Sequence, residues 1–489
     1  MSWADIYPWR SPAPGEPVIR QIYEQVRAAI VEAALKPGQR LPSSRDFAGR
    51  LGVARASVVA AYDLLLAEGY AIGRPGSGTY VSGDLSGVAE LRPAPAPSRS
   101  DPPPLPERAR DLDELQFPPP QSDPRLFATG RTLLDARAQD AWGRSARRAL
   151  RTLDAVHFGY SDPRGERGLR AAIADYLRAA RGVVCEPDQV IVTAGAQHAV
   201  DIAARVLLKP GDRVWMEDPG YPATRHALLA SQADVFHAPV DRSGLVVAAG
   251  VEAAPDAKVA FVTPSHQYPL GVTLSMGRRM ELLAWARAAR AWIVEDDYAS
   301  EFRYSGPPLE SLQGLDGGER VIYVGTLNKA LFPGLRMGYA VVPKALSLAF
   351  ANARQLMDRQ PPTLTQAIVL DFMRDGQFAA HIRRRRIAYK AQRDALADAL
   401  EARLGHLLEV DRPDQGMTLI AYLKDGRSDL AVEAMAQAGG VSVRAISRLY
   451  HQAPPAQGLM LGFSGFPART MDAGVARLAK ALEGLPPPS

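Results

Sequence analysis

The chain has 489 residues, of which 47% are hydrophobic and 23% are charged, a composition that is normal for globular domains with sizeable cores. Its length favours two to four folding units, because domains usually have about 100–200 residues. A single cysteine, Cys185, excludes a disulfide framework and a thiolate zinc site. No run approaches the roughly 18 uninterrupted apolar residues of a membrane helix. The net charge of +5 permits nucleic-acid binding without requiring it.

The first 83 residues alternate helix and turn signals. Apolar residues at helical spacing predict a first helix that Pro37-Gly38 ends. Ser43 and Ser44 provide cap chemistry for a short second helix, and a Gly-containing turn precedes the third. The helices are expected over 18–35, 45–50 and 55–67, followed by a hairpin around 73–78. Three helices and a hairpin predict a winged helix-turn-helix domain over 1–83.

Prolines dominate the next segment, so residues 84–112 are expected to form an extended, semi-rigid linker. Residues 113–489 switch repeatedly between short apolar runs and amphipathic helices, such as those over 197–208 and 278–289. This alternation predicts an α/β domain with a mostly parallel sheet covered by helices. The strands are expected over 190–193, 213–217, 259–263, 291–295 and 320–324.

Specific motifs in the first domain point to a DNA-binding function. Leu41-Pro-Ser-Ser-Arg-Asp-Phe-Ala, Leu51-Gly-Val-Ala-Arg-Ala-Ser and Gly76-Ser-Gly-Thr closely resemble the GntR family of bacterial regulators over about 17–82. The resemblance implies that the DNA contacts come from Ser44, Arg45, Arg55, Ser57 and Arg74. Arginine suits this role because its fork can bind guanine or a phosphate. The alternative is that these arginines are only solvated surface residues.

One position in the first domain departs from the family pattern. Ala54 stands where GntR proteins usually have Ser or Thr, so the third helix is expected to lack a side-chain N-cap.

Four motifs in the second domain supply what pyridoxal phosphate requires. The cofactor needs a lysine for a Schiff base, a carboxylate beside its ring nitrogen, an aromatic ring against its face, and amide, hydroxyl or arginine groups for its phosphate. Each motif follows an expected strand. The motifs are Thr193-Ala-Gly-Ala-Gln-His, Glu217-Asp-Pro-Gly-Tyr-Pro, Glu295-Asp-Asp-Tyr and Gly325-Thr-Leu-Asn-Lys, followed by Arg336. This ordered set resembles the fold-type I aminotransferases over about 115–480.

The resemblance implies a role for each cofactor-binding residue. It places the Schiff base on Lys329 and the ring-nitrogen contact on Asp296, with Asp297 as the competing candidate. The remaining implied contacts are Tyr298 to the ring hydroxyl, Tyr221 on the ring face, and Ala196, Gln197, Thr326 and Arg336 to the phosphate. Asn328 stands where Ser is common and mildly weakens the phosphate assignment.

A further tyrosine bears on whether two copies of the chain associate. Tyr160 resembles the tyrosine that these enzymes send to the partner subunit's phosphate, which implies a homodimer. The alternative is a packed core phenol.

A GntR-type head joined to an aminotransferase-like domain is the architecture of the MocR subfamily of regulators, which the phrases Thr263-Pro-Ser-His-Gln-Tyr-Pro and Arg444-Ala-Ile-Ser-Arg-Leu-Tyr also resemble. The strand over 458–463 lacks the carboxylate-binding arginine of active aminotransferases. Arg444 or Arg448 could instead bind an anionic effector, or be surface residues. The run 383–386 is interpreted as a solvated or interfacial basic face.

The resemblance therefore implies a cytoplasmic, nucleoid-associated regulator that binds operator DNA and pyridoxal phosphate, without a metal and without contact with a membrane. Its effector would be pyridoxal phosphate itself, or an amine or amino acid that reacts with the bound cofactor. The alternatives are a pyridoxal-phosphate-dependent aminotransferase with a fused DNA-binding head, and a DNA-binding protein whose large domain has lost the cofactor.

Overall fold

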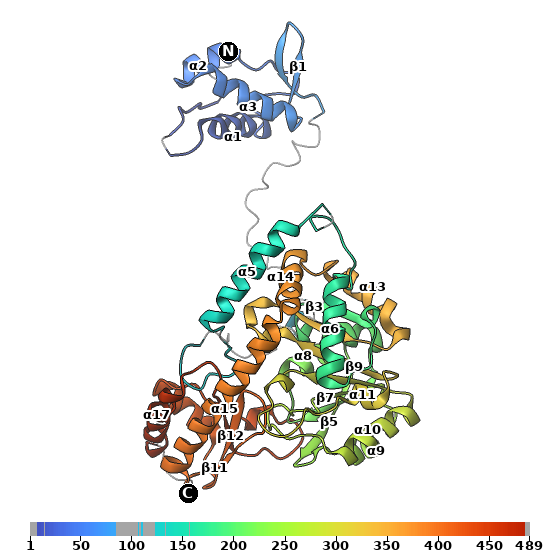
Figure 1. The fold of residues 1–489 in the computed structure, drawn as a ribbon. Helices are drawn as coiled ribbons and strands as arrows, with labels where there is room; N and C mark the ends of the chain where they lie inside the picture. The colour runs from blue at the N-terminus through green and yellow to red at the C-terminus, as the bar shows by residue number, and fades with distance from the viewer. Residues whose placement is uncertain are drawn as a thin grey trace. The chain divides into compact units, whose positions relative to one another are not determined.

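The computed structural model describes residues 7–13, 15–84, 106, 109–110, 123–132, 134–155 and 157–484. The chain divides into two compact units, Met1–Glu107 and Arg108–Ser489 (Figure 1). Most of the predicted linker, 84–112, lies outside the described residues.

The first unit has the predicted winged helix-turn-helix fold. Its core includes the buried side chains of Ile22, Val26, Phe47, Val58 and Leu65. The two strands pair antiparallel. Its elements are α1 (Val18–Val31), α2 (Ser44–Leu51), α3 (Arg55–Ala67), β1 (Ala71–Arg74) and β2 (Gly78–Val81). The first helix is shorter than predicted because the chain turns at Ala33, where φ is +59°.

The two helices of the helix-turn-helix begin differently. The Ser43 hydroxyl accepts a hydrogen bond from the Asp46 amide at 3.1 Å and donates one to the Asp46 carboxylate at 2.7 Å, which fixes the start of α2. Gly52 then reverses the chain in the left-handed conformation. Helix α3 begins after Ala54, which makes no side-chain cap, as the sequence predicts.

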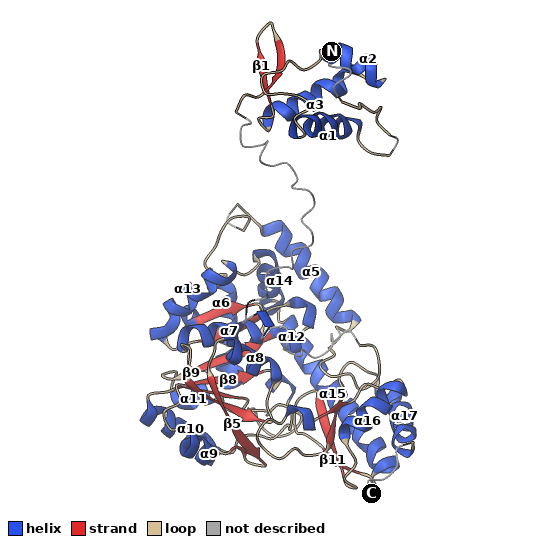
Figure 2. Cartoon of the chain, turned by 180° about the vertical axis from the view of Figure 1, so that it is seen from behind, coloured by secondary structure: helices blue, strands red, loops and turns tan. Residues whose placement is uncertain are grey.

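The second unit is built around an eight-stranded sheet with strand order β3-β10-β9-β8-β7-β4-β5-β6. Figure 2 draws the strands in red and labels β5, β8 and β9 of this sheet. Neighbouring strands from β9 to β5 run parallel, whereas β10 pairs antiparallel with β9 and β3, and β6 pairs antiparallel with β5. The strands are β3 (Val190–Thr193), β4 (Arg213–Asp218), β5 (Asp234–Asp241), β6 (Gly244–Leu245), β7 (Val259–Val262), β8 (Trp292–Asp297), β9 (Val321–Thr326) and β10 (Gly338–Val341). The predicted mostly parallel sheet is confirmed.

Helices cover both faces of this sheet. Val214 and Met216 of β4 pack in one hydrophobic cluster with α7, whereas Trp215 between them packs in another with α10. This alternation follows from the two-residue period of a strand. Trp215 stacks on Trp285 of α10 with ring centroids 3.7 Å apart. The helices between and after these strands are α7 (Ala196–Leu207), α8 (Pro222–Ala230), α9 (Val247–Ala253), α10 (Met276–Ala289), α11 (Leu312–Asp316), α12 (Leu327–Ala330) and α13 (Ser347–Asp358).

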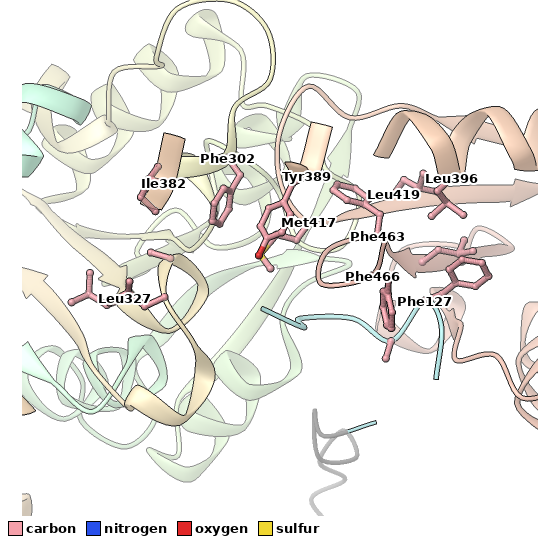
Figure 3. Packing of buried hydrophobic residues seen from close by; sticks show 14 of the residues in the cluster. Phe127, Phe302, Leu327, Ile382, Tyr389, Leu396, Met417, Leu419, Phe463 and Phe466 are labelled. Carbon is pink, nitrogen blue, oxygen red and sulfur yellow. The ribbon is translucent and has the colours of Figure 1, made fainter. Parts of the chain in front are cut away.

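A second, four-stranded antiparallel sheet follows near the C-terminus, with strand order β11-β12-β14-β13. The largest hydrophobic cluster joins it to the eight-stranded sheet; Phe463 and Leu419 belong to this cluster (Figure 3). The remaining elements are α5 (Ala136–Thr152), α6 (Arg167–Arg181), α14 (Thr363–Arg374), α15 (Gln377–Leu404), β11 (Leu408–Asp411), β12 (Thr418–Leu423), α16 (Asp429–Ala438), β13 (Arg444–Ala445), β14 (Gly458–Gly462) and α17 (Met471–Glu483).

None of the helices that the structure describes is long and apolar enough to span a membrane. The described residues also contain no cluster of three or more His, Cys, Asp or Glu side chains suited to a metal ion.

The uncapped start of α3 generates a stability prediction. Replacing Ala54 with Ser provides a hydroxyl that can accept a hydrogen bond from an amide of the first turn, since Ala54 already has extended backbone geometry. We expect about 1 kcal/mol of local stabilisation, measured as slower hydrogen exchange of the first amides of α3. Ala56→Ser, inside the first turn, is the matched control. Equal slowing in both variants would contradict the capping argument.

Candidate functional site

A cavity of about 210 Å³ opens at the C-terminal ends of the central parallel strands. Asp296 and Thr326 lie at the ends of β8 and β9, and Tyr221 and Thr263 directly follow β4 and β7. Parallel strands end at one edge of a sheet, where doubly wound folds bind their ligands. Residues of the small antiparallel sheet form the opposite wall; they are Thr418, Arg444 and Met460.

Eight of the nine residues predicted to bind the cofactor line this cavity, namely Ala196, Gln197, Tyr221, Asp296, Tyr298, Thr326, Lys329 and Arg336. The ninth, Tyr160, is not in its lining. Its side chain is 77% exposed, and the Arg359 guanidinium lies 3.8 Å from the centre of its ring. Tyr160 is therefore not a packed core phenol in this chain.

The two neighbouring aspartates of β8 have different surroundings. Asp296 lines the cavity, and its Oδ1 is buried without a hydrogen-bond partner among the described residues. Asp297 is instead held by Arg181 Nε at 2.8 Å and by the Tyr323 hydroxyl at 2.5 Å. Burial, helped by the charges of Asp297 and Glu217, raises the pKa of Asp296 to about 7. Asp296 is thus the carboxyl that a cationic group in the cavity would meet.

Lys329 reaches the cavity from α12, directly after β9. Burial, helped by the charge of Arg444, lowers the pKa of its amine to about 8. A substantial fraction of the amine is therefore neutral near pH 7–8, which is the form that attacks an aldehyde.

The N-terminus of α7 lies in the lining of the cavity. Gly195 caps this 12-residue helix with φ of +108°. This positive φ favours glycine, and a Cβ here would also lie 2.9 Å from Asn328 Nδ2. The free amides and dipole of the helix N-terminus favour a phosphate, and Arg336 and Thr326 lie in the same lining.

The cavity also contains side chains that the sequence analysis did not assign. Tyr268 packs against Tyr221 with ring centroids 5.1 Å apart and an interplanar angle of 77°. It lies in residues 263–269, a motif that resembles the MocR subfamily but carries no predicted contact. The other unassigned lining residues are Thr129, Gly130, Gly195, Thr263, Asn328, Pro333, Met417, Thr418 and Met460. Thr418 had no signal, because strand β12 was not predicted, and Met460 lies in the strand expected over 458–463, which was considered only for its missing arginine.

The two effector candidates lie in different places. Arg444 of β13 lines the cavity. Arg448 is not in its lining; its side chain is 54% exposed and forms an ion pair with Glu433 at 2.7 Å.

In the run 383–386, Arg384 and Arg385 form ion pairs with Asp135.

A carboxylate at the end of β4 binds a loop of the small sheet. Asp218 accepts hydrogen bonds from the backbone amides of His451, Gln452 and Ala453 at 2.7–2.8 Å. These amides belong to the loop between β13 and β14, so the loop is fixed beside the cavity.

The DNA-binding candidates gather at the helix-turn-helix and the hairpin. Arg45, Arg55 and Arg74 are exposed, and Ser44 and Ser57 are half-buried. Arg55 Nε donates to the Ser44 hydroxyl at 3.1 Å, which brings the starts of α2 and α3 together. Arg74 lies on the hairpin, where its guanidinium covers the Tyr80 ring at 4.5 Å.

The lowered pKa of Lys329 predicts a pH dependence. Covalent attachment of pyridoxal phosphate should become faster as the pH rises through about 8, because the neutral fraction of the amine increases. Arg444→Gln removes a positive charge that favours the neutral amine, so its rate profile should shift to higher pH. Stopped-flow absorbance measures the rate. Arg448→Gln is the control, and an equal shift in both variants would contradict this role of Arg444.

The residues present fit pyridoxal phosphate. The partnerless oxygen of Asp296, the glycine-lined helix start and the buried Lys329 match a cationic ring nitrogen, a phosphate and an aldehyde, respectively.

Comparisons with known proteins agree with both parts of the structure. Residues 128–475 match the family model of aminotransferase class I and II, and residues 18–81 match that of bacterial regulatory proteins of the gntR family. The chain is 39% identical to the probable rhizopine catabolism regulatory protein MocR of Rhizobium meliloti, over 96% of this chain and 94% of that protein. It is 34% identical to the HTH-type pyridoxine biosynthesis transcriptional regulator PdxR of Corynebacterium glutamicum, over 96% and 97%.

Among solved structures, the kynurenine aminotransferase of Pyrococcus horikoshii in complex with PMP is similar at a TM-score of 0.68 and 27% identity, covering 78% of this chain and 95% of that one. The chain therefore belongs to the MocR-type GntR transcriptional regulators, in which a DNA-binding winged helix precedes an aminotransferase-like domain with pyridoxal phosphate as its cofactor.

Proposed function

We propose that this protein regulates transcription by coupling the occupancy of the cavity to operator binding by the winged helix. The observation that carries the proposal is that Lys329, Asp296 and the N-terminus of α7 meet in one cavity of a chain that also has a winged helix-turn-helix head. In this proposal residues 1–83 are the DNA-binding head, 84–112 the linker and 113–489 the ligand-binding domain.

Each lining residue has a distinct part in this proposal. The Lys329 amine attaches the cofactor covalently, and Asp296 keeps a proton on the ring nitrogen. Tyr298 contacts the ring hydroxyl, and Tyr221 covers the ring. Ala196, Gln197, Thr326 and Arg336 bind the phosphate. When bound, pyridoxal phosphate supplies an aldehyde carbon that can react with an amino group.

Two effectors fit the cavity, namely pyridoxal phosphate itself and an amino compound that reacts with it. The position of Arg444 supports an amino compound with an anionic group, because a guanidinium in the lining can bind a carboxylate in a bidentate manner. Arg448 has less support, since it is already paired with Glu433.

We propose that the domain works as a sensor and not as an enzyme. Strand β14, Gly458–Gly462, lacks the arginine with which active aminotransferases hold a substrate carboxylate. Without that clamp an amino acid is poorly oriented for turnover. We further propose a cytoplasmic homodimer, in which Tyr160 reaches the partner's phosphate site. The exposure of Tyr160, together with the 80% exposure of the neighbouring Phe158, supports a contact at this loop.

Operator binding tests the coupling. Fluorescence anisotropy with DNA from upstream of the gene should show that pyridoxal phosphate shifts the affinity of the wild type, because occupancy changes the arrangement of the heads. Lys329→Ala should abolish both the visible absorption band and this shift, whereas Lys344→Ala, at an exposed lysine, should preserve them.

Three other results would each point elsewhere. A band without an affinity shift would exclude the cofactor as the signal and leave amines as candidates. Rapid multiple turnover with an amino donor would contradict the sensor proposal. Equal shifts in wild type and Lys329→Ala would show that covalent attachment is irrelevant.

The DNA contacts generate a separate prediction. Arg55→Ala should weaken operator binding by about 1–3 kcal/mol and reduce the preference over scrambled DNA if its fork binds a base. If it binds a phosphate, the slope of log K against log salt should fall by about 0.9. Arg20→Ala, which removes an exposed arginine of α1 that pairs with Glu24, is the control. No change in either quantity would exclude Arg55 from the interface.

A further inference from the structure

Helix α5, the first helix of the large unit, carries a row of exposed arginines, Arg137, Arg144, Arg147 and Arg151. Within the part of the chain that the structure describes, the side chains of these four arginines form no ion pair and no hydrogen bond. The fifth arginine of the helix, Arg148, differs, because it pairs with Asp371 and Asp375 of the neighbouring α14 region. The row is therefore not used for packing.

The spacing of the row places all four arginines on one face. At 3.6 residues per turn they fall within about 80° of arc, and the row from Arg137 to Arg151 is about 21 Å long. The buried residues of α5 lie on a different side of the helix, with its centre about 120° from that of the row; they are Ala138, Ala141, Ser145 and Ala149. Figures 1 and 2 both show α5 at the outside of the large unit, beside α14.

The row is distinguished by having four arginines, unpaired among the described residues, on one face of a single helix, whereas some other exposed arginines of the large unit are neutralised by ion pairs. Arg403 pairs with Asp472, and Arg412 pairs with both Asp398 and Glu401. On the row face of α5, Asp140 is the one exposed acid of the helix, so the four arginines give the face a net charge of 4 − 1 = +3.

We propose that this arginine row binds the phosphate backbone of DNA that flanks the operator, a proposal that rests on the function proposed above. Duplex DNA carries one negative charge per about 1.7 Å of its axis, so a row of about 21 Å faces about six base pairs. Arginine forks bind phosphate oxygens without reading sequence. Because the head is covalently joined to α5, operator binding raises the effective concentration of flanking DNA near the row.

This proposal predicts a contribution that depends on DNA length and salt but not on sequence. Each phosphate contact adds about 0.9 to the slope of log K against log salt, so four contacts add up to about 3.6. The winged helix alone determines the preference for the operator.

Full-length protein with two duplexes tests the proposal. One duplex contains the operator alone, and the other extends it on both sides by about two helical turns of arbitrary sequence. The test variant is R137Q/R144Q/R147Q/R151Q. The matched control, R290Q/R469Q/R477Q/K480Q, removes four exposed charges from other surfaces. Wild type and control should bind the longer duplex more tightly and with a steeper salt slope, whereas the α5 variant should bind both duplexes equally.

The proposal would be overturned if the α5 variant still bound the longer duplex more tightly than the shorter one. It would also be overturned if the control lost this preference for the longer duplex to the same extent. A changed oligomeric state of the α5 variant in light scattering would overturn it as well, because the row would then belong to a subunit contact. Binding to the short duplex reports on the head alone. Its absence in the wild type would therefore count against the proposed function, whereas the length effect counts for or against the arginine row.

Discussion

The buried ion pair between Arg181 and Asp297 fixes the end of strand β8, and the cofactor site depends on it. Successive residues of a strand point to opposite faces. Once Asp297 is held by Arg181 and the Tyr323 hydroxyl, Asp296 must face the other way, into the cavity. Removing one partner of such a pair leaves an uncompensated buried charge, at a cost of about 3–5 kcal/mol. The choice between two adjacent carboxylates is thus made by a contact outside the cavity.

Burial places the groups of the cavity in protonation states that a bound ligand can exploit. Desolvation raises the pKa of Asp296 to about 7 and lowers that of Lys329 to about 8. A cation beside Asp296 would lower its pKa, since an opposite charge favours the ionised form. The carboxyl of Asp296 and the N-terminus of α7 therefore complement a molecule with a cationic ring and an anionic tail.

The sequence predicts the elements that depend on local pattern and misses those that depend on distant pairing. The apolar runs of β4, β7, β8 and β9 are long enough to be recognised, and their ends position Tyr221, Asp296 and Lys329 correctly at one edge. Strand β13 has only two residues, and it forms because Arg444 lies opposite Met460 of β14. No periodicity can indicate a strand of that length, so the presence of Arg444 in the cavity, as opposed to Arg448, could not be derived. Tyr268 was missed for a similar reason, because it comes from a loop whose path depends on tertiary packing.

The three amides bound by Asp218 also limit how the cavity walls can move. A carboxylate that accepts three backbone hydrogen bonds holds the loop between β13 and β14 against the end of β4. These three bonds act together with the hydrophobic cluster that joins the two sheets, so the loop keeps a fixed position beside the end of β4. Asp218 stands three residues before Tyr221. One strand end therefore holds the wall formed by the small sheet and also positions an aromatic ring of the cavity, so a change at Asp218 would reach both.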